Sequence, residues 1–148
     1  MITKKLGRKK EHRERTMRNL ATSIVLYEKV QTTEAKAKSI SPVVERLLSS
    51  SLKGTLAARR DAKALLFDQN AVTKLFEDIP SRVGNRTSGF VRITKLAPRN
   101  GDGASMAQIE LLLTPVEQML QEATKTKVAV RKSKAAEEKT PKTEEPNA

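Results

Sequence analysis

A helical pattern opens at about Arg13. Its apolar residues recur at steps of three and four, and they are Met17, Leu20, Ala21, Ile24 and Tyr27. This spacing predicts an amphipathic helix with one buried face. Arg15 and Arg18 lie off that stripe, so we expect them to face outward. Residues 28–32 are partly β-branched and predict a short edge strand.

A second helix is expected over about residues 34–52. Thr32 or Thr33 can cap it by accepting a hydrogen bond from a free backbone N–H group of its first turn. Pro42 falls inside the helix and removes a backbone donor, so we expect a kink or a split there. Gly54 is typical of the position just after a helix.

Two shorter helices follow in the pattern. One runs from Thr55 to about Phe67, and the other is capped by Asn70, carries apolar residues through Ile79 and ends before Pro80. Residues 80–89 are polar and predict a loop.

Two strands are expected next, over residues 90–96 and 106–113. In the second strand every other residue is apolar, which predicts one buried face. Asn100 to Gly103 is a strong turn signal between them. The whole order predicts an α+β fold in two layers: a small three-stranded sheet, expected to be mixed, covered by about four helices.

Composition divides the chain into three parts. Hydrophobic residues make up 37% of the 148 residues, which is low for a fully packed chain. We expect a basic N-terminal arm over residues 1–12, with little that could be buried, and a globular domain over 13–114. Over residues 115–148 we expect a flexible low-complexity tail, with a short helical piece around 116–122.

Positive charge is concentrated at the start of the chain. The net charge is +12, and residues 1–19 hold eight Lys and Arg but only two Glu. Such a field indicates a polyanionic partner, with nucleic acid the first candidate and an anionic membrane surface the second.

Several classes of protein are disfavoured. No apolar run approaches the ~20 residues that span a bilayer, and no apolar segment follows the basic start, so we expect neither membrane insertion nor a secretory signal, and a cytoplasmic location. The chain has no Cys, and His12 is its only His. No phosphate-binding Gly-Lys-Ser/Thr loop is present. We therefore expect no enzyme activity, no cofactor, no metal and no small-molecule substrate.

The aromatic residues argue against one mode of RNA binding. Single-strand binders stack bases on exposed rings. Only Tyr27, Phe67, Phe76 and Phe90 are aromatic here, and each fits a core position.

Many short motifs occur in a characteristic order. They are Lys5–Arg8, His12–Arg13, Arg18–Ser23, Glu28–Thr33, Lys36–Lys38, Leu75–Phe76, Gly89–Ile93, Arg99–Asp102 and Met106–Leu111. Taken together, they resemble the L17 family of bacterial large-subunit ribosomal proteins over roughly residues 4–113. Ile2 and Thr3 replace polar residues that are common in the family, and Pro42 stands where a helix-compatible residue is usual.

The resemblance implies a function. Proteins of this family bind large-subunit ribosomal RNA on the solvent side near the polypeptide exit region, contact neighbouring ribosomal proteins and have no catalytic role. Structured RNA presents phosphates and shape more than readable base edges. Lys and Arg, with Arg able to make bidentate contacts, suit that surface.

Three groups of candidate RNA contacts follow. The first and main group comprises Lys4, Lys5, Arg8, Lys9, Lys10, His12, Arg13, Arg15, Arg18 and Asn19. The second group is Thr32, Thr33 and Lys36, at a helix N-terminus whose free N–H groups can receive a phosphate. The third group, on and beside the late strands, is Arg82, Arg86, Arg92, Lys95 and Arg99.

Two other functions remain open. A DNA-binding, nucleoid-type architectural protein would also use a basic arm, although no helix-turn-helix signature is present. A protein interaction module, with charge serving solubility, is the other. For Arg59 and Arg60 a solvated helix face is as good an explanation as a binding surface.

Overall fold

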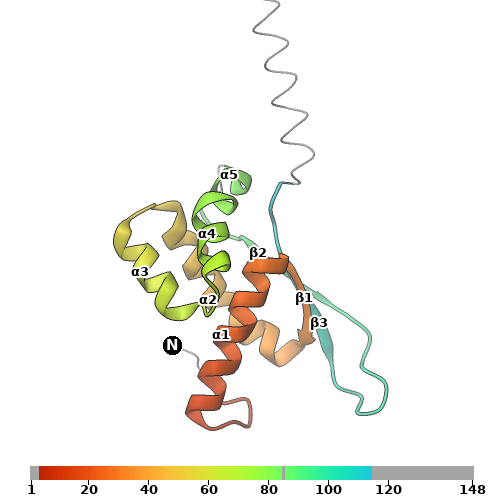
Figure 1. Ribbon diagram of the computed structural model, residues 1–148. Coiled ribbons are helices and arrows are strands. Elements are labelled where there is room, and N and C mark those ends of the chain that lie inside the picture. The colour runs from red at the N-terminus through yellow and green to blue at the C-terminus, as the bar shows by residue number, and fades with distance from the viewer. Residues whose placement is uncertain (1–3, 85, 115–148) are drawn as a thin grey trace, which may run out of the picture. The chain divides into compact units, whose positions relative to one another are not determined.

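Helices occupy the first part of the fold and a strand pair closes it (Figure 1). The structure is a computed structural model that describes residues 4–84 and 86–114. Within them the elements are α1 (Lys10–Tyr27), β1 (Lys29–Thr33), α2 (Glu34–Leu52), α3 (Leu56–Leu65), α4 (Gln69–Glu77), α5 (Ile79–Val83), β2 (Val91–Lys95) and β3 (Met106–Leu111). The α+β class is confirmed. The predicted tail and the helical piece at 116–122 lie outside the described residues.

The sheet is antiparallel throughout. Its strand order is β1-β3-β2, with Ile109 of β3 opposite both Val30 of β1 and Ile93 of β2. The expectation of a mixed sheet is therefore wrong. β1 would have paired parallel to β2 as a direct neighbour, but the return strand β3 lies between them and runs against both.

The two faces of the sheet differ in polarity. Ala107, Ile109 and Leu111 are buried on one face, and α2 packs against the sheet there. Gln108 and Glu110 alternate with them and lie on the opposite face, as the period of a strand requires. The core between sheet and helices includes Phe90 and Leu48, both fully buried.

The chain before α1 is folded onto the domain. Leu6 and Gly7 both have left-handed backbone conformations, with φ of 54° and 60°. This turn brings Leu6 against the hydrophobic core. The helix then begins at Lys10, three residues before the expected start. Little of the first twelve residues was expected to be buried, and among the described ones Leu6 packs partly against the core.

Pro42 does not divide α2, which runs as one helix from Glu34 to Leu52. Of the two outcomes expected at Pro42, the split is therefore wrong, and the kink stays a prediction. Pro42 is exposed, so its ring does not disturb the packed face of the helix. Thr33 occupies the N-cap position, but its side chain makes no capping hydrogen bond. Gly54 follows the helix with a φ of +64°, as predicted.

Side chains cap both α3 and α4. The capping residue of α4 differs from the expected one. Thr55 caps α3 by accepting a hydrogen bond from the Ala58 N–H. Asp68, not Asn70, caps α4, because the Asp68 carboxylate accepts the Asn70 N–H at 2.8 Å.

The predicted loop at 80–89 begins with a helix, α5. Pro80 stands in the first turn of α5, where its fixed φ favours a helix and its missing N–H costs nothing. Ile79 and Val83, one turn apart, are both buried. The helix forms because these two side chains reach the core.

Two of the four aromatic residues lie outside the core. Phe90 is 1% exposed and Phe76 packs against the core, but Phe67 is 57% and Tyr27 is 72% exposed. Leu66 takes the buried position after α3, and its extended backbone turns the next residue, Phe67, the other way. The expectation that all four are core residues was wrong for these two.

Candidate nucleic-acid interface

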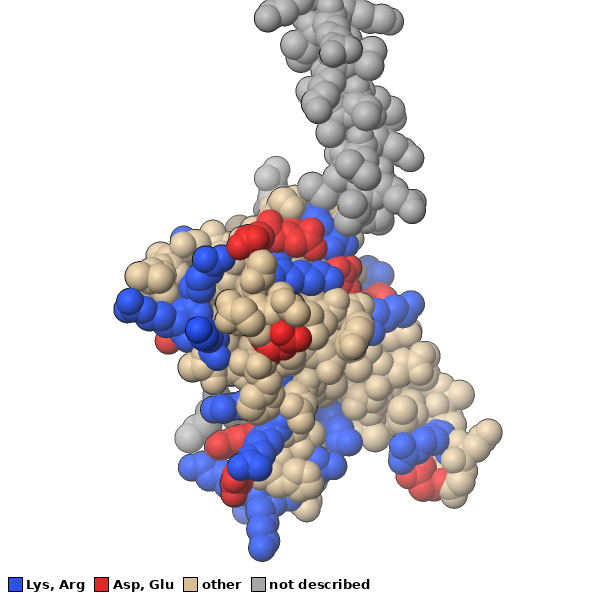
Figure 2. Space-filling view, viewed as in Figure 1, with Lys and Arg blue, Asp and Glu red and all other residues tan. Residues whose placement is uncertain are grey.

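The main predicted group of cations lies on α1 and the turn before it. Figure 2 shows Lys and Arg gathered where α1 begins, at the bottom of the view. Most of these side chains are exposed, while Arg8 and Arg13 are half-buried. The structure therefore places the first group along the first part of α1 and the turn before it.

Arg8 ties the N-terminal turn to α1. Its Nη1 donates to the Thr16 hydroxyl at 2.6 Å and lies 3.2 Å from His12 Nε2. Arg13 Nη1 in turn donates to the Arg8 carbonyl at 3.3 Å. These contacts hold the turn around Arg8 against α1, so its cations are partly preorganised for a partner.

The remaining α1 candidates have weaker local contacts. Arg15 pairs with Glu11 at 2.7 Å, but both side chains are largely exposed, and such pairs contribute little to stability. The Arg18 guanidinium lies over the Phe67 ring, 5.9 Å from its centroid, a cation–π contact that orients it. Asn19 is exposed. Arg15 and Asn19 can therefore turn toward a partner, whereas Arg18 is oriented by Phe67.

The second group lies beside the first. Thr33 shares a small groove with Lys4 and Lys38 at the start of α2. Glu34 occupies the same helix end, pairs with Lys38 at 2.6 Å and lies 3.7 Å from Lys95. The hydrogen bond from Lys38 lowers the pKa of Glu34. A carboxylate thus already faces the positive end of α2, which opposes phosphate binding there. The other two members of the second group are half-buried, namely Thr32 and Lys36.

Arg82 of the third group serves the interior. It is 7% exposed and makes bidentate hydrogen bonds of 2.7 and 2.9 Å to Glu28, with a third contact to Asp78 at 2.9 Å. Lys74 also pairs with Glu28, at 2.7 Å. The Arg82 hydrogen bond lowers the pKa of Glu28 to about 2, and Glu28 raises that of Arg82.

The other members of the third group are dispersed. Arg92 lies on the outer face of the sheet, 3.6 Å from Glu110. Lys95 and Arg92 are separated by an odd number of positions in β2, and side chains alternate between faces along a strand, so Lys95 belongs to the opposite face. Arg99 forms a 2.6 Å ion pair with Asp102 in the connecting loop, and Arg86 donates to the Leu112 carbonyl at 2.8 Å. These residues do not form one surface.

Two basic residues that the sequence did not single out join the α1 group. Lys38 lines the small groove with Lys4. Arg46 of α2 lines a larger groove with Lys5, Lys10 and Arg13. In the sequence, Arg46 stands next to Leu47, which belongs to the apolar stripe of α2. This position is only a weak indication that Arg46 belongs to a binding surface. Only the packing of α2 beside α1 places it with the other cations.

Other kinds of site have no support in residues 4–84 and 86–114. No cluster of three or more His, Cys, Asp or Glu side chains is placed to hold a metal ion in that part of the chain. None of its helices combines the length and the hydropathy needed to cross a membrane.

The comparisons with known proteins agree on one family. The family model described as ribosomal protein L17 matches residues 16–112. The chain belongs to the ribosomal protein L17 family. The "Large ribosomal subunit protein bL17" of Chlorobium limicola is 49% identical over 109 residues, which cover 74% of this chain and 72% of that protein. The protein of the same name from Desulfitobacterium hafniense is 44% identical over 112 residues, covering 76% of this chain and all of the relative. That from Carboxydothermus hydrogenoformans is 47% identical over 108 residues, or 73% and 96% of the two chains.

Membership in the L17 family confirms the resemblance drawn from the ordered motifs. It also confirms that the chain is a ribosomal protein of a structural family and not an enzyme. The family match spans most of α1 through β3, and much of the α1 cation group, from Lys4 to Arg15, precedes it. The individual RNA contacts therefore stay predictions.

Proposed function

We propose that this L17-family protein is a structural constituent of the large ribosomal subunit in the cytoplasm, where it binds large-subunit ribosomal RNA. Its relatives carry the name of a large-subunit protein. The location near the polypeptide exit region, beside neighbouring ribosomal proteins, is proposed from the family resemblance. The role of the protein there is to stabilise RNA structure by neutralising phosphates.

The gathering of cations on α1 and its preceding turn carries this proposal. Eight Lys and Arg and two Glu lie within residues 1–19, and one of the two carboxylates, that of Glu11, is engaged by Arg15. Like charges held this close repel one another without a polyanion. Phosphate contacts release condensed counterions, which drives association with nucleic acid.

The proposed contact surface is narrower than the full set of candidates. Its centre is the α1 group, from Lys4 to Asn19. Lys36 and Thr33 stand at its edge, and Lys38 and Arg46 extend it. Arg82 is left out, because its guanidinium is buried against Glu28 and Asp78. Arg86, Arg92 and Arg99 would contact RNA only from other faces, whereas Lys95 lies beside Glu34 of the small groove, at 3.7 Å.

Sedimentation of a gently lysed extract that contains tagged protein tests the proposal. We expect the protein to migrate with the large subunit on a sucrose gradient and to remain bound through a moderate-salt wash. Nuclease treatment should then release it, which a protein interaction module would resist. Recovery at the top of the gradient, or with the nucleoid, would contradict a ribosomal location.

A binding competition separates RNA from DNA. Purified protein is bound to a labelled ribosomal RNA fragment at physiological salt. Unlabelled large-subunit ribosomal RNA, or duplex DNA of equal phosphate concentration, is then added as the competitor. We expect ribosomal RNA to compete at least tenfold better. Equal competition would favour the architectural DNA-binding function instead.

A further inference from the structure

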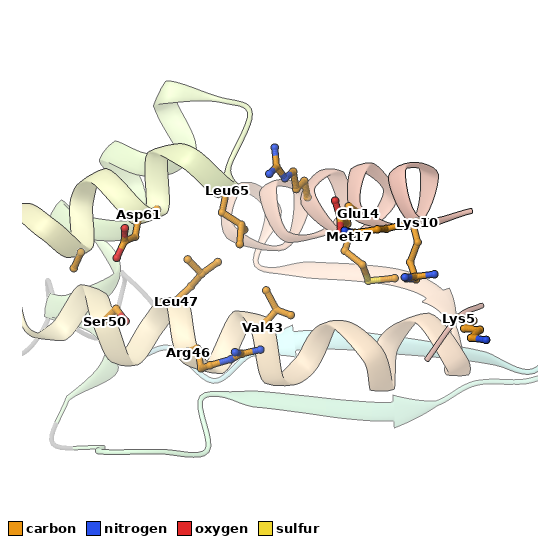
Figure 3. A pocket seen from close by; sticks show the side chains of 14 residues that line it. Lys5, Lys10, Glu14, Met17, Val43, Arg46, Leu47, Ser50, Asp61 and Leu65 are labelled. Carbon is orange, nitrogen blue, oxygen red and sulfur yellow. The ribbon is translucent and has the colours of Figure 1, made fainter. Parts of the chain in front are cut away.

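A groove of about 850 Å³ opens between α1, α2 and α3. Figure 3 shows its labelled side chains, with Met17 from α1, Val43 and Leu47 from α2 and Leu65 from α3 directed into the space between the helices. The volume lies in the range of sites that enclose a small molecule or a single chemical group of a larger one.

The floor of the groove is apolar. Met17, Leu47 and Ala62 are buried, with exposed fractions of 2%, 9% and 1%. Val43 and Leu65 are partly exposed and pack against the same core. Met17, Leu47 and Ala62 already lie out of water, so the apolar surface left to cover is mainly that of Val43 and Leu65. Covering it with a flat apolar group is favourable in water.

The rim of the groove is basic. It carries Lys5, Lys10, Arg13, Arg18 and Arg46, against the carboxylates of Glu14 and Asp61. Within the described residues, the Nε of Arg13 is buried without a hydrogen-bond partner, a costly state that an added acceptor would relieve.

Two of the rim arginines are held in position. The cation–π contact with Phe67 orients Arg18. The Nε of Arg46 donates to the Pro42 carbonyl at 3.1 Å, which directs its side chain along α2. These two guanidinium groups are therefore partly ordered before any partner arrives.

We infer that this groove binds one unstacked nucleotide of the RNA, with its base against the apolar floor and its phosphates against the basic rim. The inference rests on the proposed function and assigns a subsite to it. A nucleotide combines a flat apolar face with an anionic link, and RNA-binding proteins take up bases that are turned out of a helix. Four of the five rim cations belong to the α1 group proposed to contact RNA, so the groove continues that surface.

Cross-linking in assembled subunits tests the occupant directly. The chain has no Cys, so Ser50→Cys places a single thiol on the groove lining, and Ser49→Cys places a matched thiol on the exposed side of α2. Each variant is labelled with an azidophenacyl photo-cross-linker as the purified protein and is then incorporated into large subunits. We expect position 50 to cross-link to an unpaired ribosomal RNA nucleotide that position 49 does not reach. A cross-link from position 50 to protein only, or none, would overturn the inference.

Binding measurements add matched variants. Ser50→Trp fills the groove, and Ser49→Trp adds the same bulk outside it. Arg46→Gln removes a rim charge, and Arg60→Gln removes the same charge from the exposed face of α3. We expect Ser50→Trp and Arg46→Gln to weaken the binding of large-subunit ribosomal RNA by about tenfold, and each control by less than about twofold. Urea unfolding of each variant verifies that it is folded.

The outcomes separate the inference from the function. If the wild-type protein does not bind ribosomal RNA, the proposed function fails. If it binds and both groove variants bind as tightly as their controls, the groove assignment alone is wrong.

Discussion

Glu28 joins the end of α1 to α4 and α5 through its carboxylate. It accepts hydrogen bonds from the buried Arg82 and pairs with Lys74, which also donates to the Leu26 carbonyl at 2.8 Å. Glu28 itself has a left-handed backbone with a φ of 62°, which turns the chain from α1 into β1. The residue thus fixes both the path of the chain and the position of two helices.

This network makes stability depend on pH in a specific way. The pKa of Glu28 falls from 4.5 to about 2 in the folded state. Because the folded pKa is the lower one, the contribution is complete above about pH 4.5 and is lost as the pH falls towards 2. We expect Glu28→Gln to reduce the free energy of unfolding at pH 7 by about 2–3 kcal/mol. The loss stays moderate because the Glu28 side chain is 27% exposed and Asp78 still pairs with Arg82.

Urea unfolding between pH 7 and pH 3 measures this effect. The difference between wild type and Glu28→Gln should shrink as the pH drops through 4.5. Glu77→Gln is the matched control, since Glu77 pairs with Arg59 at 3.2 Å and both side chains are exposed. It should cost less than about 1 kcal/mol. A Glu28→Gln loss no larger than that of the control would show that the network adds no net stability.

Pro42 is the clearest conflict between residue type and element. It lacks the N–H that would bond to the Lys38 carbonyl one turn earlier, yet α2 continues through it. The apolar face of α2 explains this, because Ile40, Val44 and Leu48 are all fully buried. Tertiary packing of that face outweighs the local preference of proline.

The conflict predicts that Pro42→Ala stabilises the protein. Restoring the backbone donor should raise the free energy of unfolding by about 1–3 kcal/mol, seen as a higher urea midpoint. Ser41→Ala, the neighbouring position, controls for helix propensity and should change stability by about 0.5 kcal/mol or less. A lower midpoint for Pro42→Ala would mean that proline stabilises by restricting the unfolded chain.

Element boundaries were predictable where local signals agreed with burial. The alternation of Ala107, Ile109 and Leu111 correctly predicted the buried face of β3. The α5 helix was missed because polar residues around Pro80 predict a loop, and only contact of Ile79 and Val83 with the core stabilises a helix there. The cap of α4 was assigned two residues late, since Asp68 and Asn70 are equally good capping residues.

Across the whole molecule, charge is segregated more than composition alone shows. Cations on the N-terminal turn and the start of α1 line two grooves together with Lys38 and Arg46 of α2. Arg59, Arg60 and Lys63 lie on α3, where Figure 2 shows a second group of basic side chains at the left. The two groups allow the position of the RNA surface to be tested at constant net charge.

Salt dependence provides that test. Lys4, Lys9 and Lys10 are exposed and form no ion pair within the described residues. We expect their triple replacement by Gln to weaken ribosomal RNA binding and to reduce the slope of log Kobs against log salt by about 2–3. Lys53 at the C-terminal cap of α2 is exposed, as are Arg60 and Lys63 of α3. Replacing these three by Gln removes the same charge elsewhere and should change the slope by less than about 1. Equal changes would show that binding is not centred on α1.

The sequence by itself determined the fold class, the order of most elements, the family and the end of the chain that carries the charge. These follow from periodicity, capping chemistry, ordered motifs and residue counts, all of which are local or additive. Only the tertiary structure decided that β3 lies between β1 and β2, that Arg82 is buried against Glu28, that Phe67 is exposed beneath Arg18, and that Arg46 joins the α1 cations. Each of these depends on which segments, distant in sequence, pack side by side, and a pattern along one chain does not encode that directly.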